Sequence, residues 1–360
     1  MKILQIAPLI ERVPPKTYGG TERVVHALTE QLVKRGHDVT LFATGDSQTC
    51  AKLVSVCDSA LREQKNQNPY KPNTWTLLNI GLAYQQQEAF DIIHDHNNEV
   101  SLPTANLAKT PVVITMHGAF NPNKIRLYEE LRNPYVVSIS NAQRQNAPYL
   151  NYIGNVYNGL PMQDYPFSKT DDGYLLFVGR ISMEKGVHYA IAVAKMLHLP
   201  LLIAAKLDAI DTPYFAAYVK PHLSKQIKWI GEVNEQERNM LMSRALCFLH
   251  PVTWPEPFGL TLIESMSCGA PVVAFRKGSI PEVIKHGKTG FVVQNVPEMI
   301  SAVKKIRTIN RSYCRRYALT NFSDETMADG YEAIYDTMLQ EKYTFQQKSK
   351  ENDLKKYLYI

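Results

Sequence analysis

Glu256 and Glu264, in the segment PEPFGLTLIE, are the two residues whose spacing points most clearly to chemistry. Glu256 falls in a proline-rich loop. Beside the free amides of Phe258, Gly259 and Leu260 at a helix start, its carboxylate can bind several sugar hydroxyls. Glu264 falls inside the following helix and can take two ribose hydroxyls. Spacing alone favours an exposed glutamate there, but the helix is apolar almost all round, which favours a buried carboxylate with a partner.

A second candidate is the segment VGRISMEKG, which places Arg180 and Lys185 on one loop directly after an apolar strand. Two cations at the carboxyl end of a sheet, before a helix, suit a diphosphate. Arginine can bind it through two hydrogen bonds, and lysine adds a point charge. A solvated loop with two surface cations is the alternative reading.

The segment YGGTE lies between the first apolar strand and the first helical pattern. Gly19 and Gly20 would let a ligand approach the backbone, and Thr21 can cap the helix, whose free N–H groups attract phosphate. A tight turn with a helix cap is an equally good reading of so short a fragment. It is not the six-residue dinucleotide fingerprint.

Weaker candidates lie elsewhere in the first half. His94, Asp95 and His96 end a strand in the segment HDHN, and Asp95 and His96 are expected to face a cleft. The two histidines would share one face. No third ligand is evident, so no metal site is predicted. Arg144 could reach a phosphate or an acceptor, and a plain surface arginine fits as well.

These residues depend on an alternation of short apolar runs with helical patterns. Strands are predicted at 2–8, 38–44, 90–96, 111–117, 135–140, 174–180, 200–205, 227–231, 245–251, 271–275 and 289–293. Helices are predicted at 21–35, 187–197, 235–245, 260–267 and 297–309. Apolar strands separated by helices indicate parallel sheets covered on both faces. A linker at 158–173 would join two such sheets and leave a ligand cleft between them.

Composition limits the class of protein. The chain has 360 residues, enough for two domains, with 45% apolar and 21% charged residues and a net charge of +6. This mild charge, without an aromatic-basic cluster, disfavours a nucleic-acid binder. Five cysteines without a C-x-x-C pair, and no apolar run of about 18 residues, fit a cytoplasmic protein without a transmembrane segment. Contact of the lysine-containing tail with a membrane surface is compatible with this composition.

Taken together, these motifs resemble the family 4 glycosyltransferases, which have the two-domain GT-B fold. The resemblance rests on the Gly-Gly loop, on Gly-Arg with Glu-Lys-Gly, and on the paired glutamates. The segments GAPVV and GFVV add to it, and it extends from Lys2 to about Tyr335. It implies an α/β chain with a Rossmann-like acceptor-side domain at 1–160 and a nucleotide-sugar domain at 172–320. A helix at about 323–342 would pack back onto the first domain, leaving a tail at 343–360.

The resemblance also implies roles for single residues. Arg180 and Lys185 would bind the diphosphate and stabilise it as it leaves. Glu264 would bind the ribose, and Glu256 with the amides of residues 258–260 would bind the transferred sugar. Gly19 and Gly20 would lie against the phosphates, and His117 would sit near the anomeric carbon. Without the family, His117 is a lone histidine at a strand end and reads as structural.

The family retains anomeric configuration, and its favoured mechanism needs neither a protein base nor a metal. The donor would be a UDP- or GDP-linked sugar, and no cofactor is implied. The acceptor would be a glycan, a glycolipid or a small molecule, selected by loops 11–15, 95–99 and 121–126, with Glu11 among the candidates. The alternatives are a nucleotide-sugar epimerase or hydrolase of the same fold, and a non-catalytic sugar-nucleotide binding protein.

Overall fold

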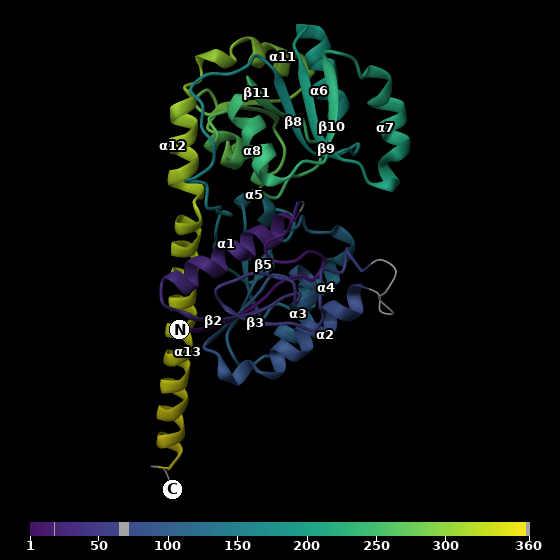
Figure 1. The fold of residues 1–360 in the computed structure, drawn as a ribbon. Helices are drawn as coiled ribbons and strands as arrows, with labels where there is room; N and C mark the ends of the chain where they lie inside the picture. Colours follow the sequence, from purple (N-terminus) through teal and green to yellow (C-terminus); the bar gives the residue numbers. More distant parts are fainter. Residues whose placement is uncertain (18, 65–71, 358–360) are drawn as a thin grey trace.

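The computed structural model describes residues 1–17, 19–64 and 72–357 and contains two α/β domains, one above the other in Figure 1. Tyr18 of the Gly-Gly segment lies outside the described residues. The N-terminal domain has a seven-stranded, wholly parallel sheet in the order β3-β2-β1-β4-β5-β6-β7. Its strands are β1 (Lys2–Ile6), β2 (Asp38–Phe42), β3 (Lys52–Val54), β4 (Ile92–Asp95), β5 (Val112–Met116), β6 (Tyr135–Ser138) and β7 (Tyr152–Asn155).

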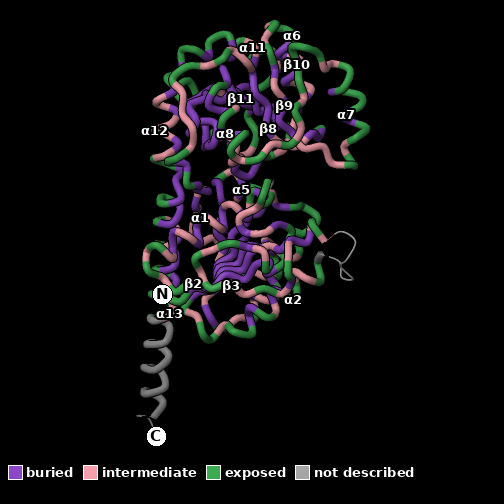
Figure 2. Tube along the Cα trace, viewed as in Figure 1, coloured by how far each residue is buried: buried purple, intermediate pink, exposed green. Residues whose placement is uncertain are grey.

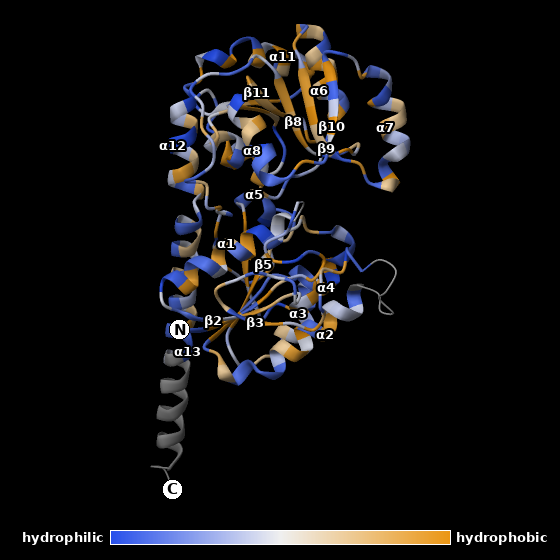
Figure 3. Ribbon diagram, viewed as in Figure 1, coloured by the Kyte–Doolittle hydropathy of each residue, from blue (hydrophilic) through white to orange (hydrophobic). Residues whose placement is uncertain are grey.

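The C-terminal domain has a six-stranded parallel sheet in the order β10-β9-β8-β11-β12-β13. Its strands are β8 (Leu175–Arg180), β9 (Leu201–Lys206), β10 (Ile227–Gly231), β11 (Cys247–His250), β12 (Val272–Phe275) and β13 (Gly290–Val293). Every residue of the central strands β11 and β12 is buried, as expected for strands covered by helices on both faces. The buried, apolar sheets are visible in Figures 2 and 3.

The structure contains every predicted helix and strand, together with several that were not predicted. The helices are α1 (Gly20–Lys34), α2 (Pro72–Gln85), α3 (Leu102–Ala105), α4 (Ile125–Glu130), α5 (Asn141–Arg144), α6 (Val187–Leu197), α7 (Thr212–Tyr218), α8 (Glu235–Arg244), α9 (Leu260–Ser267), α10 (Ile280–Val283), α11 (Val296–Lys304), α12 (Arg311–Phe322) and α13 (Asp324–Tyr357). The helix predicted at 297–309 is shorter, because a 3-10 turn replaces it at Ile306–Thr308. The edge strands β3 and β7 were not predicted. They are short and only partly buried, so they carry no continuous apolar run.

The C-terminal helices return the chain to the first domain, with α12 beside the C-terminal sheet and α13 running down past the N-terminal one (Figure 1). Tyr331 and Tyr335 of α13 are fully buried among residues of α1 and β1. The helix continues through the residues predicted as a tail, as far as Tyr357. Within the described chain, no helix combines the length and apolarity that crossing a membrane requires.

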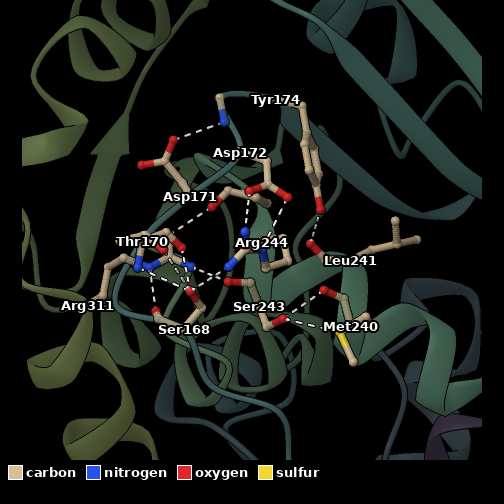
Figure 4. Close-up of polar contacts among 12 residues, drawn as sticks. Ser168, Thr170, Asp171, Asp172, Tyr174, Met240, Leu241, Ser243, Arg244 and Arg311 are labelled. Atoms are coloured by element: carbon tan, nitrogen blue, oxygen red, sulfur yellow. Dashed lines mark hydrogen bonds and ion pairs between the residues drawn. The ribbon is translucent and has the colours of Figure 1, made fainter.

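The predicted linker region crosses between the domains and is fixed at both ends. Leu160 forms a parallel bridge with Ser323, between α12 and α13. Near the other end, Asp172 accepts two hydrogen bonds from Arg244, at 2.6 and 3.1 Å (Figure 4). The guanidinium of Arg311 donates to the carbonyl oxygens of Ser168, Ser243 and Ala245. These contacts attach the connection to the C-terminal domain.

Candidate functional site

The candidate site is a cavity of about 410 Å³ lined by both domains. In each sheet the strand order reverses once, between β1 and β4 and between β8 and β11. Ligands of open α/β sheets bind beyond the carboxyl ends of the strands at such reversals. Residues following β1, β8 and β11 line the cavity, among them Glu11, Lys185 and Glu256. The fold therefore brings loops from the two sheets to one place.

Glu256 lies at one side of the cavity among three neighbours that bind or face its carboxylate. Its Oε2 atom accepts hydrogen bonds from Lys185 Nζ at 2.8 Å and from Trp254 Nε1 at 3.0 Å. His250 Nε2 lies 3.7 Å from the same oxygen. Burial alone would raise the pKa of Glu256, but its interactions with His250 and Lys185 outweigh burial and lower it to about 2. This carboxylate is therefore ionised at neutral pH.

The lowered pKa of Glu256 predicts that the free energy of unfolding decreases at acid pH. Its ionised form stabilises the fold above the unfolded pKa of 4.5, and this contribution is lost as the pH falls toward 2. We expect the free energy of unfolding of the wild type to exceed that of Glu256→Gln by up to roughly 3 kcal/mol at pH 7, with the gap closing between these pH values. Urea unfolding across this range measures the gap. Glu88→Gln, at an exposed carboxylate, is the control, and a gap for Glu256→Gln that is independent of pH would contradict the assignment.

Glu264, on α9, is the most deeply buried charge of the cavity wall, with a side chain that is 0% exposed. Its Oε1 atom accepts a hydrogen bond from Arg238 on α8 at 2.7 Å and is also ion-paired with Arg23 on α1. Its Oε2 atom is buried and makes no hydrogen bond with the described residues. The carboxylate thus has one oxygen held by two arginines and one buried oxygen without a partner among the described residues.

Arg23, in the first domain, connects the two domains through its ion pair with Glu264. Besides Glu264, its guanidinium donates to Tyr165 Oη at 2.9 Å and to Glu235 at 3.0 Å. Burial alone would lower the pKa of Arg23, but Glu264, Tyr165 and Glu235 hold it above its ordinary value. A helix of the first domain is therefore ion-paired with two helices of the second, directly beside the cavity.

Arg180 ends β8 at the cavity, where it is ion-paired with Glu184 of the turn that follows the strand. Its Nε atom lies 3.7 Å from Asp211, and about a third of its side chain is exposed. Lys185 is more enclosed, and its Nζ lies 4.9 Å from the centre of the Trp254 ring. Both predicted diphosphate ligands thus line the cavity, together with four further cations, Arg23, Arg62, Lys206 and Arg238.

Two helices begin at the cavity, and each is preceded by a glycine. Gly259 precedes α9 with a φ of +85°, a left-handed conformation that L side chains rarely adopt. Gly19 precedes α1, and a Cβ atom on Gly20 would lie 3.4 Å from Leu260 at the start of α9. The starts of α1 and α9 therefore adjoin across the domain boundary. The free N–H groups of a helix start favour an anion.

His117, at the end of β5, lines the cavity from the first domain. Its backbone N–H donates to Asn98 Oδ1 at 2.6 Å. Burial lowers its pKa to about 3, so the ring is neutral at physiological pH. Glu11 lines the same cavity and is ion-paired with Arg62, while its place near an acceptor stays a prediction.

Three predicted cleft residues are not among those that line the cavity. Asp95 is fully buried and accepts hydrogen bonds from the backbone and side chain of Asn97, both at 2.9 Å. His96 is buried behind His117. Arg144 donates to Ser138 at 2.6 Å and lies over the Tyr152 ring. The expectation that Asp95 and His96 face the cleft was wrong, because both are fully buried inside the first domain. Arg144 is partly buried and does not line the cavity, and whether it reaches an acceptor stays untested.

Several cavity residues were not singled out from the sequence. Glu22 and Arg23 directly follow the Gly-Gly loop, and this position was the one signal that could have indicated them. Burial raises the pKa of Glu22 to about 7. Trp254, His250 and Arg238 carried no recognisable local signal. In the ranges described, no group of three His, Cys, Asp or Glu residues is arranged to hold a metal ion.

Comparisons with known proteins bear on the family and the fold of this chain. The family model "Glycosyltransferase Family 4" matches residues 18–147, and "Glycosyl transferases group 1" matches residues 163–321. Glycogen synthase of Mycobacterium tuberculosis is 24% identical over 93% of this chain and 94% of its own. N-acetyl-alpha-D-glucosaminyl L-malate synthase of Bacillus anthracis is 25% identical over 90% and 95%. The crystal structure of HepE from Anabaena with UDP and glucose covers 94% of this chain and 100% of its own, with a TM-score of 0.72 and 19% identity.

Proposed function

Since this chain belongs to the family 4 glycosyltransferases and has their GT-B fold, we propose that it transfers a hexose from a UDP- or GDP-linked donor to an acceptor hydroxyl. The transfer would retain the anomeric configuration of the sugar and would need no metal. The observation that carries the proposal is the cavity itself. Six cations line it together with Glu256 and Glu264, and these two carboxylates pair with different cations, Lys185 in one case and Arg23 with Arg238 in the other. A nucleotide sugar has matching groups, with a diphosphate for the cations and two polyols for the two carboxylates.

The diphosphate would lie between Arg180, Lys185 and the starts of α1 and α9. As the bond to the sugar breaks, negative charge grows on the leaving phosphate. Cations and N–H groups already in place stabilise that charge without reorganisation. These groups can supply the compensation that a divalent cation gives in other transferases, which is why we propose a metal-independent reaction.

The two carboxylates would define the ends of the donor. The free Oε2 atom of Glu264 would accept hydrogen bonds from the ribose diol, because its other oxygen is held by Arg238 and Arg23. Glu256 would accept hydrogen bonds from hydroxyls of the transferred sugar. Its pKa of about 2 makes it a poor proton acceptor near neutral pH.

Retention would follow from attack on the same face that the phosphate leaves. The acceptor oxygen forms a bond to the anomeric carbon as the bond to the phosphate oxygen breaks, and the acceptor proton passes to that phosphate oxygen. The protein then needs to orient the reactants and exclude water rather than supply a base. Glu11 and His117 lie on the first-domain wall, where the acceptor would bind.

Calorimetric titration of the full chain with UDP, GDP and ADP, each with magnesium or with EDTA, tests the proposal. We expect one of the first two to bind with the same affinity in both conditions. Slow hydrolysis of its sugar conjugates, followed by NMR, would then identify the sugar and the anomer released. Binding that requires magnesium would overturn the metal-independent part. Donor epimerisation would favour the epimerase alternative, and binding without turnover would favour a non-catalytic binding protein.

A further inference from the structure

A buried row of three histidines runs from the cavity wall into the core of the first domain. His117 lies at the cavity, and its Nε2 atom is 3.0 Å from Nδ1 of His96. The His96 ring lies against that of His94, with 4.0 Å between ring centroids. His94 and His96 are fully buried, and neither is used by the proposed transfer reaction.

The inner end of the row is held by hydrogen bonds that leave little freedom. His94 Nδ1 is 2.6 Å from Tyr335 Oη on α13, and its Nε2 is 2.7 Å from Thr115 Oγ1 on β5. Thr115 Oγ1 is in turn 2.8 Å from Tyr331 Oη. Because His94 is fixed on both sides, it gives the His96 ring a rigid neighbour.

The contact between His96 and His117 requires one nitrogen to donate and the other to accept. Both rings are neutral. Burial, and then the neighbouring histidines, hold the pKa of His96 well below its ordinary value, and burial lowers that of His117 to about 3. Only one proton can therefore lie between the two nitrogens, and each ring has its single proton on one nitrogen.

The surroundings of Nε2, the ring nitrogen of His96 that does not contact His117, decide which ring donates the hydrogen bond. Its Nε2 atom is buried and has no hydrogen-bond partner among the described residues. A proton on that nitrogen would be a buried N–H without an acceptor, and orphaned N–H groups are rarer in proteins than under-satisfied acceptors. The proton of His96 is therefore placed on Nδ1, from which it is donated to Nε2 of His117.

We propose that His96 is a positioning residue that fixes His117 in the tautomer protonated at Nδ1, so that His117 presents a hydrogen-bond donor to the ligand in the cavity. With Nε2 accepting from His96, Nδ1 is the ring nitrogen left for the ligand. The group that receives this bond is an oxygen acceptor, namely a sugar hydroxyl or ring oxygen. This identification of the ligand rests on the proposed function, whereas the tautomer does not.

The proposal has a consequence for the chemistry. An Nδ1–H group cannot remove a proton from an incoming hydroxyl, so His117 would orient the sugar and would not act as a base. The opposite tautomer would turn a lone pair toward the cavity and place a potential base beside the acceptor. His96 thus decides whether His117 presents a hydrogen-bond donor or a hydrogen-bond acceptor to the cavity.

The test is long-range ¹H–¹⁵N NMR of the histidine side chains in the full chain at neutral pH, with His117→Ala identifying the His117 signals. We expect the wild type to show His117 protonated at Nδ1 and His96→Phe to shift it toward the Nε2-protonated form. His96→Asn, whose amide N–H can stand in for Nδ1–H, should restore the wild-type pattern. Donor hydrolysis should fall roughly 10- to 100-fold in His96→Phe, the range found when orienting partners behind metal ligands are removed. His96→Asn should recover most of it.

The outcomes separate this proposal from the proposed function. A wild type with His117 protonated at Nε2, or a His96→Phe variant with an unchanged tautomer, would overturn the role of His96, whatever nucleotide binds. If both His96 variants merely lowered the thermal midpoint, with the same tautomer as the wild type, His96 would be a packing residue. Absence of nucleotide binding together with the expected tautomers would instead remove the sugar as the ligand and leave the positioning role standing.

Discussion

Lys185→Ala is expected to lower the rate of sugar transfer, or of donor hydrolysis, about 100- to 1,000-fold, as loss of one preorganised charge-stabilising group does in other enzymes. Lys185 presents an enclosed ammonium at the cavity, 2.8 Å from Glu256 and over the Trp254 ring. It follows β8 at the reversal of strand order, where the leaving phosphate would lie. Alanine keeps the backbone and removes the charge that would stabilise that phosphate, together with the ion pair that Lys185 makes with Glu256.

The same substitution should weaken binding of the nucleotide sugar less than it slows turnover. The cation meets more negative charge in the transition state than in the intact nucleotide sugar, so its removal lowers kcat more than it raises the dissociation constant of that donor. Arg180 is expected to matter less for turnover, because its guanidinium is more exposed to solvent than the ammonium of Lys185. Steady-state kinetics and calorimetry on the same preparations measure the two quantities.

Lys288→Ala is the matched control, because Lys288 is an exposed lysine of the same domain, outside the cavity. It should leave both turnover and affinity unchanged. If Lys185→Ala kept more than half of the wild-type rate with a normal thermal midpoint, Lys185 would not stabilise the leaving group. The diphosphate would then have to be placed elsewhere in the cavity.

The sequence predicts the core of both sheets well, because strands such as β8 and β11 are buried on both faces and appear as unbroken apolar runs. Of the predicted site residues, Arg180 ends β8, Lys185 lies in the loop after β8, and Glu256 lies in the loop after β11. Their position beyond a strand end is fixed by topology rather than by their own side chains. The edge strands β3 and β7 lack this signal because their faces are only partly buried.

The errors concern side-chain direction and contacts between distant parts of the chain. Asp95 and His96 were expected to face the cleft because they end a strand. Hydrogen bonding within the domain turns their side chains inward instead. Arg23 and Arg238 reach Glu264 from two other helices, one of them in the other domain. The apolar helix around Glu264 indicated that it would have a partner, but no local pattern could identify which residue it is.

Glu264→Ala is expected to destabilise the protein by about 3–5 kcal/mol, the usual cost of removing one partner of a buried ion pair. The side chains of Arg23 and Arg238 are only about a tenth exposed, and both point at the Oε1 atom that would be lost. The variant would leave two guanidinium groups facing an apolar gap. It should also lose nucleotide affinity, because the oxygen proposed to bind the ribose disappears with it.

Two further variants separate the stability effect from the binding effect. Glu264→Gln keeps the volume and removes the charge, so it should recover part of the stability while nucleotide binding stays weak. Asp336→Ala, at an exposed carboxylate on α13, should change neither quantity. Urea unfolding and calorimetry measure stability and affinity on each preparation. A Glu264→Ala variant as stable as the wild type would mean that the arginines do not depend on this carboxylate.

A double-mutant cycle with Arg23→Ala then tests whether the ion pair acts across the domains. If Arg23 is held mainly by Glu264, its removal should cost clearly less in the Glu264→Ala background than in the wild type. The coupling should not vanish when nucleotide binds, because the ribose is proposed to use Oε2 while Arg23 uses Oε1. If saturating nucleotide abolished the coupling, the ligand would be displacing Arg23 from Glu264. Arg23 would then be a competitor of the donor, released on binding, instead of a residue that holds the carboxylate ready for it.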